Sequence, residues 1–154
     1  MLISQHLKPE AVLLDTKGQT TAEVLGELAG NIASQHKELD AGKLEEALVQ
    51  REALLSTASG NEIAFPHCYC KIKNPRFAIA ISKQGVDAEA PDDKPVHIFL
   101  LVISPEKDPN IHLEALSAAS KLFLCKDVRE QVKSAGSPDE LIGYIIEAEK
   151  KANE

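Results

Sequence analysis

Apolar residues recur at helical spacing in the first third of the chain, between polar turns. Thr20-Thr21-Ala22-Glu23 matches a capping box, and the apolar residues behind it predict a helix at about 21–35. Asp40 is suited to cap a second helix that runs through Leu55. Its predicted inner stripe consists of Leu44, Ala47, Leu48, Leu54 and Leu55.

The middle of the chain changes to short β-branched apolar runs. Phe77–Ile81 and Val96–Ile103 are separated by a polar segment rich in Gly, Pro and Asp, which is typical of two strands joined by a loop. Because these runs are continuous rather than alternating, we expect both strands to be buried on both faces.

Helical spacing returns after Pro105. Asp108 followed by Pro109 predicts a helix start, and Ser137-Pro138-Asp139-Glu140 predicts the start of the last helix. Its charged tail, about 150–154, is expected to fray. Two helices, strands and then two or three helices predict a layered α/β domain, with residues 1–154 forming a single unit.

Charge and composition narrow the classes of partner. The 154 residues carry 17 Lys+Arg and 24 Asp+Glu, a net charge of −7, with only four Phe, two Tyr and no Trp. An acidic chain with few stacking side chains is a poor nucleic-acid binder. Val96–Ile103 is far below the roughly 20 residues needed to span a bilayer, and three cysteines make no disulfide framework. We therefore expect a cytoplasmic protein without membrane insertion.

Three residues stand out from their local patterns. Arg51 falls within the predicted apolar stripe, where its planar fork suits a phosphate or carboxylate; the alternative is a structural ion pair or an arginine that reaches the rim. Pro66 restricts the backbone before His67, so the imidazole is suited to accept a phosphoryl group; the alternative is a hydrogen-bonded loop histidine. His112 lies in the first turn of a helix, where an anion is favoured, or is a surface histidine.

Cys68 and Cys70 suggest a metal site with His67. A zinc ion needs about four ligands, whereas Cys-x-Cys in an extended segment places both thiols on one face and His67 on the other. We therefore predict no metal site. We interpret His6, His36 and His97 as surface or strand-edge residues.

The stretch from Arg51-Glu52-Ala53-Leu54-Leu55-Ser56-Thr57 to Gly60-Asn61-Glu62-Ile63-Ala64-Phe65-Pro66-His67, with His112-Leu113 about 45 residues later, resembles a known family. It is similar to the fructose/mannitol-type enzyme IIA domain of the bacterial phosphotransferase system, including the nitrogen-regulatory branch. The resemblance covers essentially the whole chain and implies a central mixed β-sheet flanked by helices.

The resemblance also implies roles for individual residues. His67 would accept phosphoryl from the histidine-containing phosphocarrier protein, with Arg51 and His112 beside it. Ser56, Thr57 and Gly60 would support the phosphate site, and no metal or organic cofactor would be required. The phosphoryl group would pass to a sugar-transport IIB component or serve as a nitrogen-type regulatory signal. We favour regulation, because no carrier or membrane domain is attached to these residues. The oligomeric state stays open.

The chain departs from the family pattern in three places. Ala58-Ser59-Gly60 replaces Gly-aliphatic-Gly, Phe65 replaces an aliphatic residue, and Cys68 replaces a frequent glycine. These changes suggest a slow or redox-sensitive relay. They also motivate an alternative function: an interaction module with a degenerate IIA site that is never phosphorylated.

Overall fold

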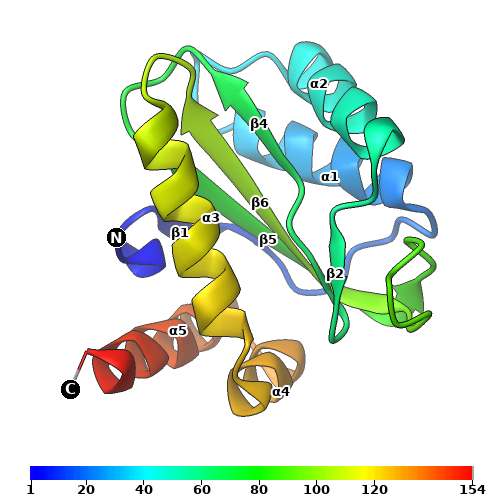
Figure 1. The fold of residues 1–154 in the computed structure, drawn as a ribbon, viewed down its shortest axis with the longest axis vertical. Coiled ribbons are helices and arrows are strands. Elements are labelled where there is room, and N and C mark those ends of the chain that lie inside the picture. The colour runs from blue at the N-terminus through cyan, green and yellow to red at the C-terminus, as the bar shows by residue number, and fades with distance from the viewer. Residues whose placement is uncertain (154) are drawn as a thin grey trace.

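A six-stranded mixed β-sheet lies between two layers of helices (Figure 1). The structure, a computed structural model, describes residues 1–153. The elements are a 3₁₀ helix η1 (Ile3–Gln5), β1 (Leu7–Leu13), α1 (Thr21–Ala33), α2 (Ala41–Leu54), β2 (Ala58–Gly60), β3 (Ile63–Ala64), β4 (His67–Cys70), β5 (Arg76–Val86), β6 (Val96–Pro105), α3 (Pro109–Phe123), α4 (Lys126–Ser134) and α5 (Pro138–Ala152).

The sheet has the order β1-β5-β6-β3-β2, and β4 continues the pairing along β6 beyond β3. β5 and β6 are antiparallel, with Ile79 opposite Leu100, whereas β3 and β4 both run parallel to β6. β1 runs parallel to β5 at the other side. The expected α/β fold with a mixed sheet is confirmed.

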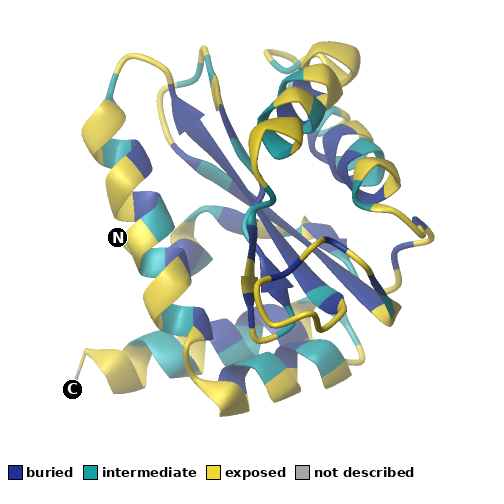
Figure 2. Cartoon of the chain, turned by 45° about the vertical axis from the view of Figure 1, so that its right-hand side comes forward, coloured by how far each residue is buried: buried dark blue, intermediate teal, exposed yellow. Residues whose placement is uncertain are grey.

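Helices cover both faces of this sheet. α1 and α2 pack together on one face, and α3, α4 and α5 cover the other, as Figures 1 and 2 show. The two central strands are therefore buried from both sides: residues 77–82 of β5 and 98–105 of β6 are all buried. This confirms the expectation drawn from their continuous apolar runs.

The predicted helix starts are confirmed by their caps. Thr20 Oγ1 accepts from the backbone N–H of Glu23 at 3.2 Å, and Asp40 Oδ1 accepts from that of Lys43 at 2.9 Å. Asp108 caps α3, with Pro109 in the first helical position, and Ser137 caps α5. Each cap satisfies a backbone donor that has no partner inside its helix.

The predicted inner stripe of α2 is wrong at its C-terminal end. The helix ends at Leu54, and Leu55 is extended, with φ −167°. Their side chains are 84% and 72% exposed, and only Leu44 and Leu48 of this helix are buried. The angular spacing that placed Leu55 in the core assumed that the helix continued through it.

Several elements were not predicted. The apolar pattern of β1 is interrupted by Lys8, Pro9 and Glu10, so the sequence shows no clear alternation for this edge strand. α4 buries only Val128 and Val132, too few residues for a recognisable stripe. α5 continues to Ala152, further than the charge of the tail predicts; Glu154 lies outside the described residues. No helix in residues 1–153 is long and apolar enough to cross a membrane.

Candidate functional site

His67 begins β4, directly after Pro66, and its ring is held by the backbone. The ring Nδ1 lies 2.9 Å from the carbonyl oxygen of Phe65, and the Pro66 carbonyl accepts from Val102 of β6. A carbonyl can only accept, so Nδ1 carries the proton and donates it. The lone pair of the neutral imidazole is therefore on Nε2.

His112 comes from the first turn of α3, as the helix start at Asp108-Pro109 predicts, and it lies beside His67, as the resemblance implies. Its ring centroid lies 5.2 Å from that of His67, and its Nδ1 is 2.6 Å from the hydroxyl of Ser104. The residue is buried, and burial, followed by the nearby His67, lowers the pKa of His112 below 6.5. A neutral imidazole is therefore the dominant form at neutral pH.

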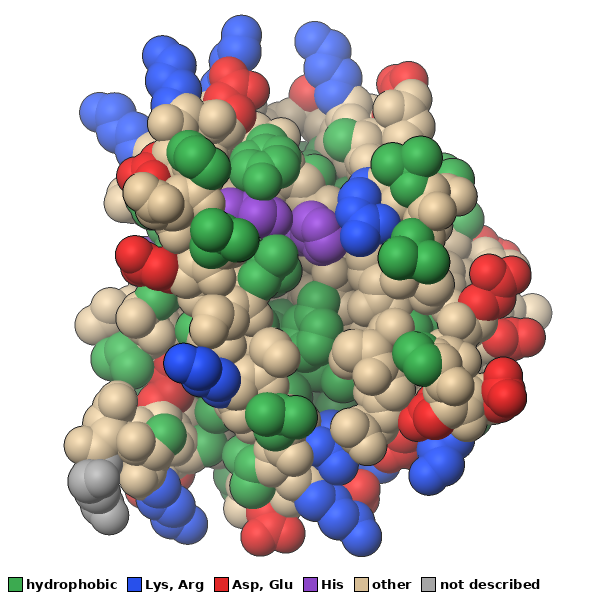
Figure 3. All heavy atoms as spheres, in the orientation of Figure 1, with side chains coloured by type: hydrophobic (Ala, Val, Ile, Leu, Met, Phe, Trp, Pro, Cys, Tyr) green, Lys and Arg blue, Asp and Glu red, His purple; other side chains and the backbone are tan. Residues whose placement is uncertain are grey.

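Tyr69 is a member of this cluster that the sequence analysis missed. Its ring centroid lies 4.5 Å from that of His112, and half of the residue is exposed. The strand alternation that separates Cys68 and Cys70 from His67 also places residue 69 on the His67 face, so the signal was present. In Figure 3 two histidine side chains lie side by side at the surface, with one basic side chain beside them and apolar side chains around them.

Both histidines keep one ring nitrogen available. Within residues 1–153 neither Nε2 atom has a hydrogen-bond partner, and neither is a buried unpaired atom, so each is in contact with solvent. The two Nδ1 atoms are each occupied by a neighbouring group. Chemistry with a ligand or partner is therefore directed to the Nε2 atoms.

Arg51 lies in the last turn of α2, which packs against β4. Its side chain is half-buried, and its Nη1 donates to the carbonyl of Leu55 at 2.7 Å. The guanidinium therefore stabilises the end of the helix rather than interrupting a buried stripe. A guanidinium has five N–H donors, so most of them remain free for an anion.

Ser56 and Thr57 form the link between α2 and β2. Thr57 donates its backbone N–H and its hydroxyl to the two carboxylate oxygens of Glu52, and its carbonyl accepts from Phe65 at 3.1 Å. Ser56 donates instead to the carbonyl of Ala88. Thr57 thus orders the segment whose carbonyl orients His67, while the hydroxyl of Ser56 is directed to another loop.

Gly60 is not brought to the histidine pair. Gly60 pairs with Ile63 of β3, and Ile63 pairs with Ile98 of β6. His67 pairs with Val102 of β6. Ile98 and Val102 are about 13 Å apart along the strand. Gly60, Asn61 and Glu62 all have positive φ, at 87°, 57° and 70°, and they form the β2–β3 turn. Ala58 and Ser59, which depart from the family pattern, lie in this hairpin as well.

Cys68 and Cys70 lie on the opposite face of β4 from His67, as predicted. Cys68 is buried and Cys70 half-buried. A hydrogen bond between the two thiols raises the pKa of Cys68, with burial adding to the effect, and lowers that of Cys70. Cys68 therefore adds no reactive group beside His67. Among residues 1–153 no three His, Cys, Asp or Glu side chains are grouped to hold a metal ion.

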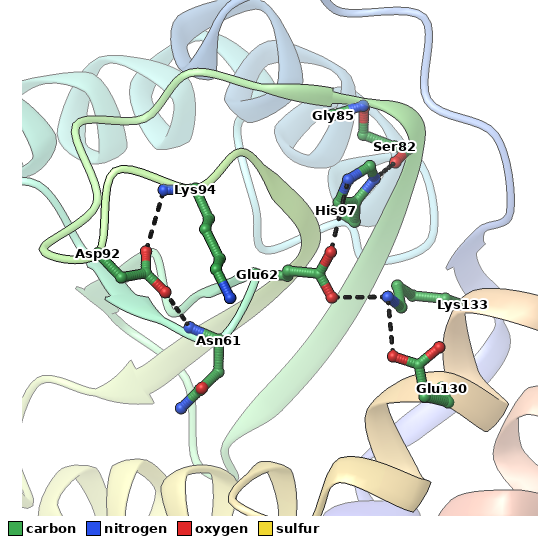
Figure 4. Close-up of polar contacts among 9 residues, drawn as sticks. All are labelled: Asn61, Glu62, Ser82, Gly85, Asp92, Lys94, His97, Glu130 and Lys133. Atoms are coloured by element: carbon green, nitrogen blue, oxygen red, sulfur yellow. Dashed lines mark hydrogen bonds and ion pairs between the residues drawn. The ribbon is translucent and has the colours of Figure 1, made fainter.

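The strand-edge interpretation of His97 is wrong, because β6 is an inner strand of the sheet. The ring is half-buried, and its Nδ1 lies 2.7 Å from the carbonyl of Ser82. Its Nε2 faces Glu62 at 3.7 Å, and Glu62 pairs with Lys133 of α4 at 2.6 Å (Figure 4). This cluster joins the β2–β3 turn to the helical layer.

Known proteins share this arrangement of sheet and helices. The crystal structure of the nitrogen regulatory protein IIA-Ntr from Neisseria meningitidis matches with a TM-score of 0.85 and 27% identity, covering 93% of this chain and 98% of that chain. IIA mannitol from Escherichia coli matches in fold, with a TM-score of 0.76 and 18% identity over 90% and 97% of the two chains. A further solved structure of that mannitol enzyme IIA is a complex with phosphorylated enzyme IIB. The architecture is that of an enzyme IIA.

Sequence comparison gives the family. Residues 5–148 match the family described as "Phosphoenolpyruvate-dependent sugar phosphotransferase system, EIIA 2", and the chain belongs to this family. The nitrogen regulatory protein of Pseudomonas aeruginosa is 32% identical over 148 residues, 96% of each chain. The fructose-specific EIIABC component of Bacillus subtilis is 32% identical over 151 residues, 97% of this chain but 24% of that protein's length.

Proposed function

We propose that this chain is a phosphohistidine carrier and that Nε2 of His67 is the phosphoryl acceptor. The observation that carries the proposal is the hydrogen bond from His67 Nδ1 to the Phe65 carbonyl. It holds the lone pair of the ring on Nε2, at a solvent-reachable position beside His112. Membership in the family supports phosphoryl transfer as the reaction, and the tautomer of His67 supports Nε2 as the atom that accepts the phosphoryl group.

The transfer exchanges one N–P bond for another. Nε2 of His67 attacks the phosphorus, a new N–P bond forms, and the bond to the donor's imidazole breaks as that imidazole leaves. Arg51 neutralises charge on the phosphoryl oxygens, and His112 provides a second polar contact from its free Nε2. The catalytic contribution of the protein is then positioning and charge stabilisation.

The rim of the site suits a protein partner. Leu54 and Leu55 beside Arg51, Tyr69 beside His67 and Leu113 beside His112 are large apolar residues that are at least half exposed. Apolar side chains around a reactive centre are typical of a docking surface. We propose that the histidine-containing phosphocarrier protein docks here to deliver the phosphoryl group.

The same surface would serve the next partner in turn. The complex of the E. coli mannitol enzyme IIA with phosphorylated IIB motivates a IIB acceptor for this chain. The nitrogen regulatory and fructose-specific relatives are equally similar, at 32% identity each, and it is the structural match to IIA-Ntr, with a TM-score of 0.85, that leads us to propose a regulatory output first. Transfer of label from the phosphorylated chain to an added IIB component would contradict the regulatory choice.

The central experiment is phosphorylation by phosphoenolpyruvate, enzyme I and the phosphocarrier protein. We expect acid-labile phosphate on the wild-type chain and none on His67→Ala. Absence of label on the wild type, or full label on His67→Ala, would contradict the proposal. Absence of label would instead favour the unphosphorylated interaction module, whose motivating residues Ala58 and Ser59 lie in β2, away from the histidine pair.

A further inference from the structure

Ser104 is the polar residue within the continuously buried part of β6, residues 98–105. It lies in β6 opposite Tyr69 of β4, and it is completely buried. Side chains of opposed residues on adjacent strands project to the same face of a sheet, so Ser104 and Tyr69 share the face that carries His67. The ring of His112 contacts both: Tyr69 by its ring and Ser104 by the hydroxyl.

The direction of the Ser104–His112 hydrogen bond follows from counting donors. Within residues 1–153 the Ser104 hydroxyl has one partner, Nδ1 of His112, at 2.6 Å. If Nδ1 carried the proton, the buried O–H would have no acceptor, which costs free energy. If the hydroxyl donates, both groups are satisfied and the ring proton is on Nε2.

We propose that Ser104 is a positioning residue that fixes His112 as a neutral imidazole with its proton on Nε2. The two histidines then have complementary free nitrogens: His67 presents a lone pair and His112 presents an N–H donor. An N–H donor beside the acceptor nitrogen can bond an oxygen of the incoming phosphoryl group.

The lowered pKa of His112 agrees with this assignment. Burial disfavours the imidazolium, and the facing His67 adds to the effect. A cationic His112 would have protons on both nitrogens and would need no help from Ser104. For a neutral ring, which nitrogen carries the proton depends on the partner of the other, and here that partner is the hydroxyl.

The tautomer can be measured without a phosphoryl donor. We propose ¹⁵N–¹H correlation spectra of histidine-labelled protein at about pH 8, above the ordinary histidine pKa. The wild type should show the His112 proton on Nε2 and an Nδ1 resonance shifted by hydrogen-bond acceptance. A proton on Nδ1 would overturn the inference directly.

Variants connect the tautomer with transfer. Ser104→Ala should remove the hydrogen-bond shift at Nδ1 and slow phosphorylation of His67 roughly tenfold, the effect of one hydrogen bond. Ser104→Thr keeps the hydroxyl and should restore both. Ser82→Ala is the matched control, because Ser82 is another completely buried serine, hydrogen-bonded to Gly85 away from the site.

The expected slowing of phosphorylation rests on the proposed function, whereas the expected tautomer of His112 does not. The outcomes therefore distinguish a failure of one from a failure of the other. If Ser104→Ala is phosphorylated at the wild-type rate and its His112 Nδ1 resonance is unchanged, the inference about Ser104 is wrong. Equal slowing by Ser104→Ala and Ser82→Ala would also overturn it, because a general packing defect would then be the cause. If the wild type is never phosphorylated, the proposed function fails, while the position of the proton still decides the role of Ser104.

Discussion

Two histidines of this chain share a local arrangement and differ in what lies beyond it. His67 and His97 each direct Nδ1 to a backbone carbonyl, Phe65 at 2.9 Å and Ser82 at 2.7 Å. The second nitrogen of His97 faces the carboxylate of Glu62, which Lys133 pairs from α4 (Figure 4). The second nitrogen of His67 has no partner in residues 1–153 and lies next to a neutral His112.

We propose that this difference separates a structural histidine, His97, from a phosphoryl-accepting one, His67. A carbonyl accepts from Nδ1 in both cases, so the role depends on the group that Nε2 meets. Around His97 the charges are paired and hold the β2–β3 turn to the helices. Around His67 the free Nε2 lies among apolar residues that a partner protein can cover.

Replacing the two histidines is the strongest test of this comparison. His67→Asn should abolish acid-labile phosphorylation, because the acceptor nitrogen is gone, while leaving the thermal midpoint nearly unchanged. His97→Asn should keep phosphorylation within about twofold and lower the free energy of unfolding by about 1 kcal/mol, because the ring that faces Glu62 in the cluster with Lys133 is lost. Equal loss of phosphorylation in both variants would remove the distinction.

Two arginines that cap helix ends allow the next comparison. Arg51 donates to the Leu55 carbonyl after α2, and Arg129 donates to the Phe123 and Leu124 carbonyls at the end of α3. Arg51→Ala should slow phosphoryl transfer about a hundredfold, since one charge-stabilising donor set is lost. Arg129→Ala should leave the rate nearly unchanged. Similar initial rates for both variants would assign Arg51 to helix capping alone.

The ion pair of the His97 region should affect stability and not transfer. Lys133→Ala removes the cation that pairs with Glu62 and Glu130, and we expect a loss of about 1 kcal/mol in urea unfolding. The control is Lys150→Ala, whose pair with Glu147 is exposed and contributes close to nothing. A change in transfer rate by Lys133→Ala would couple the two regions.

Acid should weaken the two regions in different pH windows. The pKa of His112 is lowered below 6.5, so the unfolded chain takes up a proton before the native one, and stability falls as pH drops below about 6.5. Lys133 lowers the pKa of Glu62 below 4.5, so its contribution is present above that pH and is lost as pH falls through the native value. Urea unfolding should show the first step reduced in His112→Asn, with a remainder from His6 and His36, whose pKa values burial also lowers, and the second step reduced in Lys133→Ala.

Much of the fold could be predicted from local sequence, because its strongest signals are local. The caps Thr20, Asp40, Asp108 and Ser137 satisfy donors within three residues, so their helices begin where the sequence predicts. β5 and β6 are recognisable as inner strands by their continuous apolar runs. β1 and β4 gain their pairing from β5 and β6, distant in sequence, and carry weak patterns of their own.

The candidate site was predictable only in part. Arg51, His67 and His112 stand out as polar residues in special positions, and the family resemblance unites them. Strand alternation places Tyr69 on the His67 face and Ser104 follows an apolar run, but their contacts with His112 depend on β4 lying beside β6 and on α3 packing against β6. Gly60 is included through the resemblance alone, and its position in the β2–β3 hairpin, away from the histidine pair, follows from strand pairings that only the fold shows.

The sequence by itself determined the starts of α1, α2, α3 and α5, the two buried strands, the face on which the Cys68 and Cys70 thiols lie, and the family. These features depend on residue spacing and on residues that are neighbours in the sequence, and neither depends on tertiary contacts. Only the tertiary structure decided that Nε2 is the free nitrogen of His67, that Ser104 bonds His112, and that His97 belongs to an ion-paired cluster. Those facts depend on which distant groups meet a side chain, and packing of the sheet against its helices settles that.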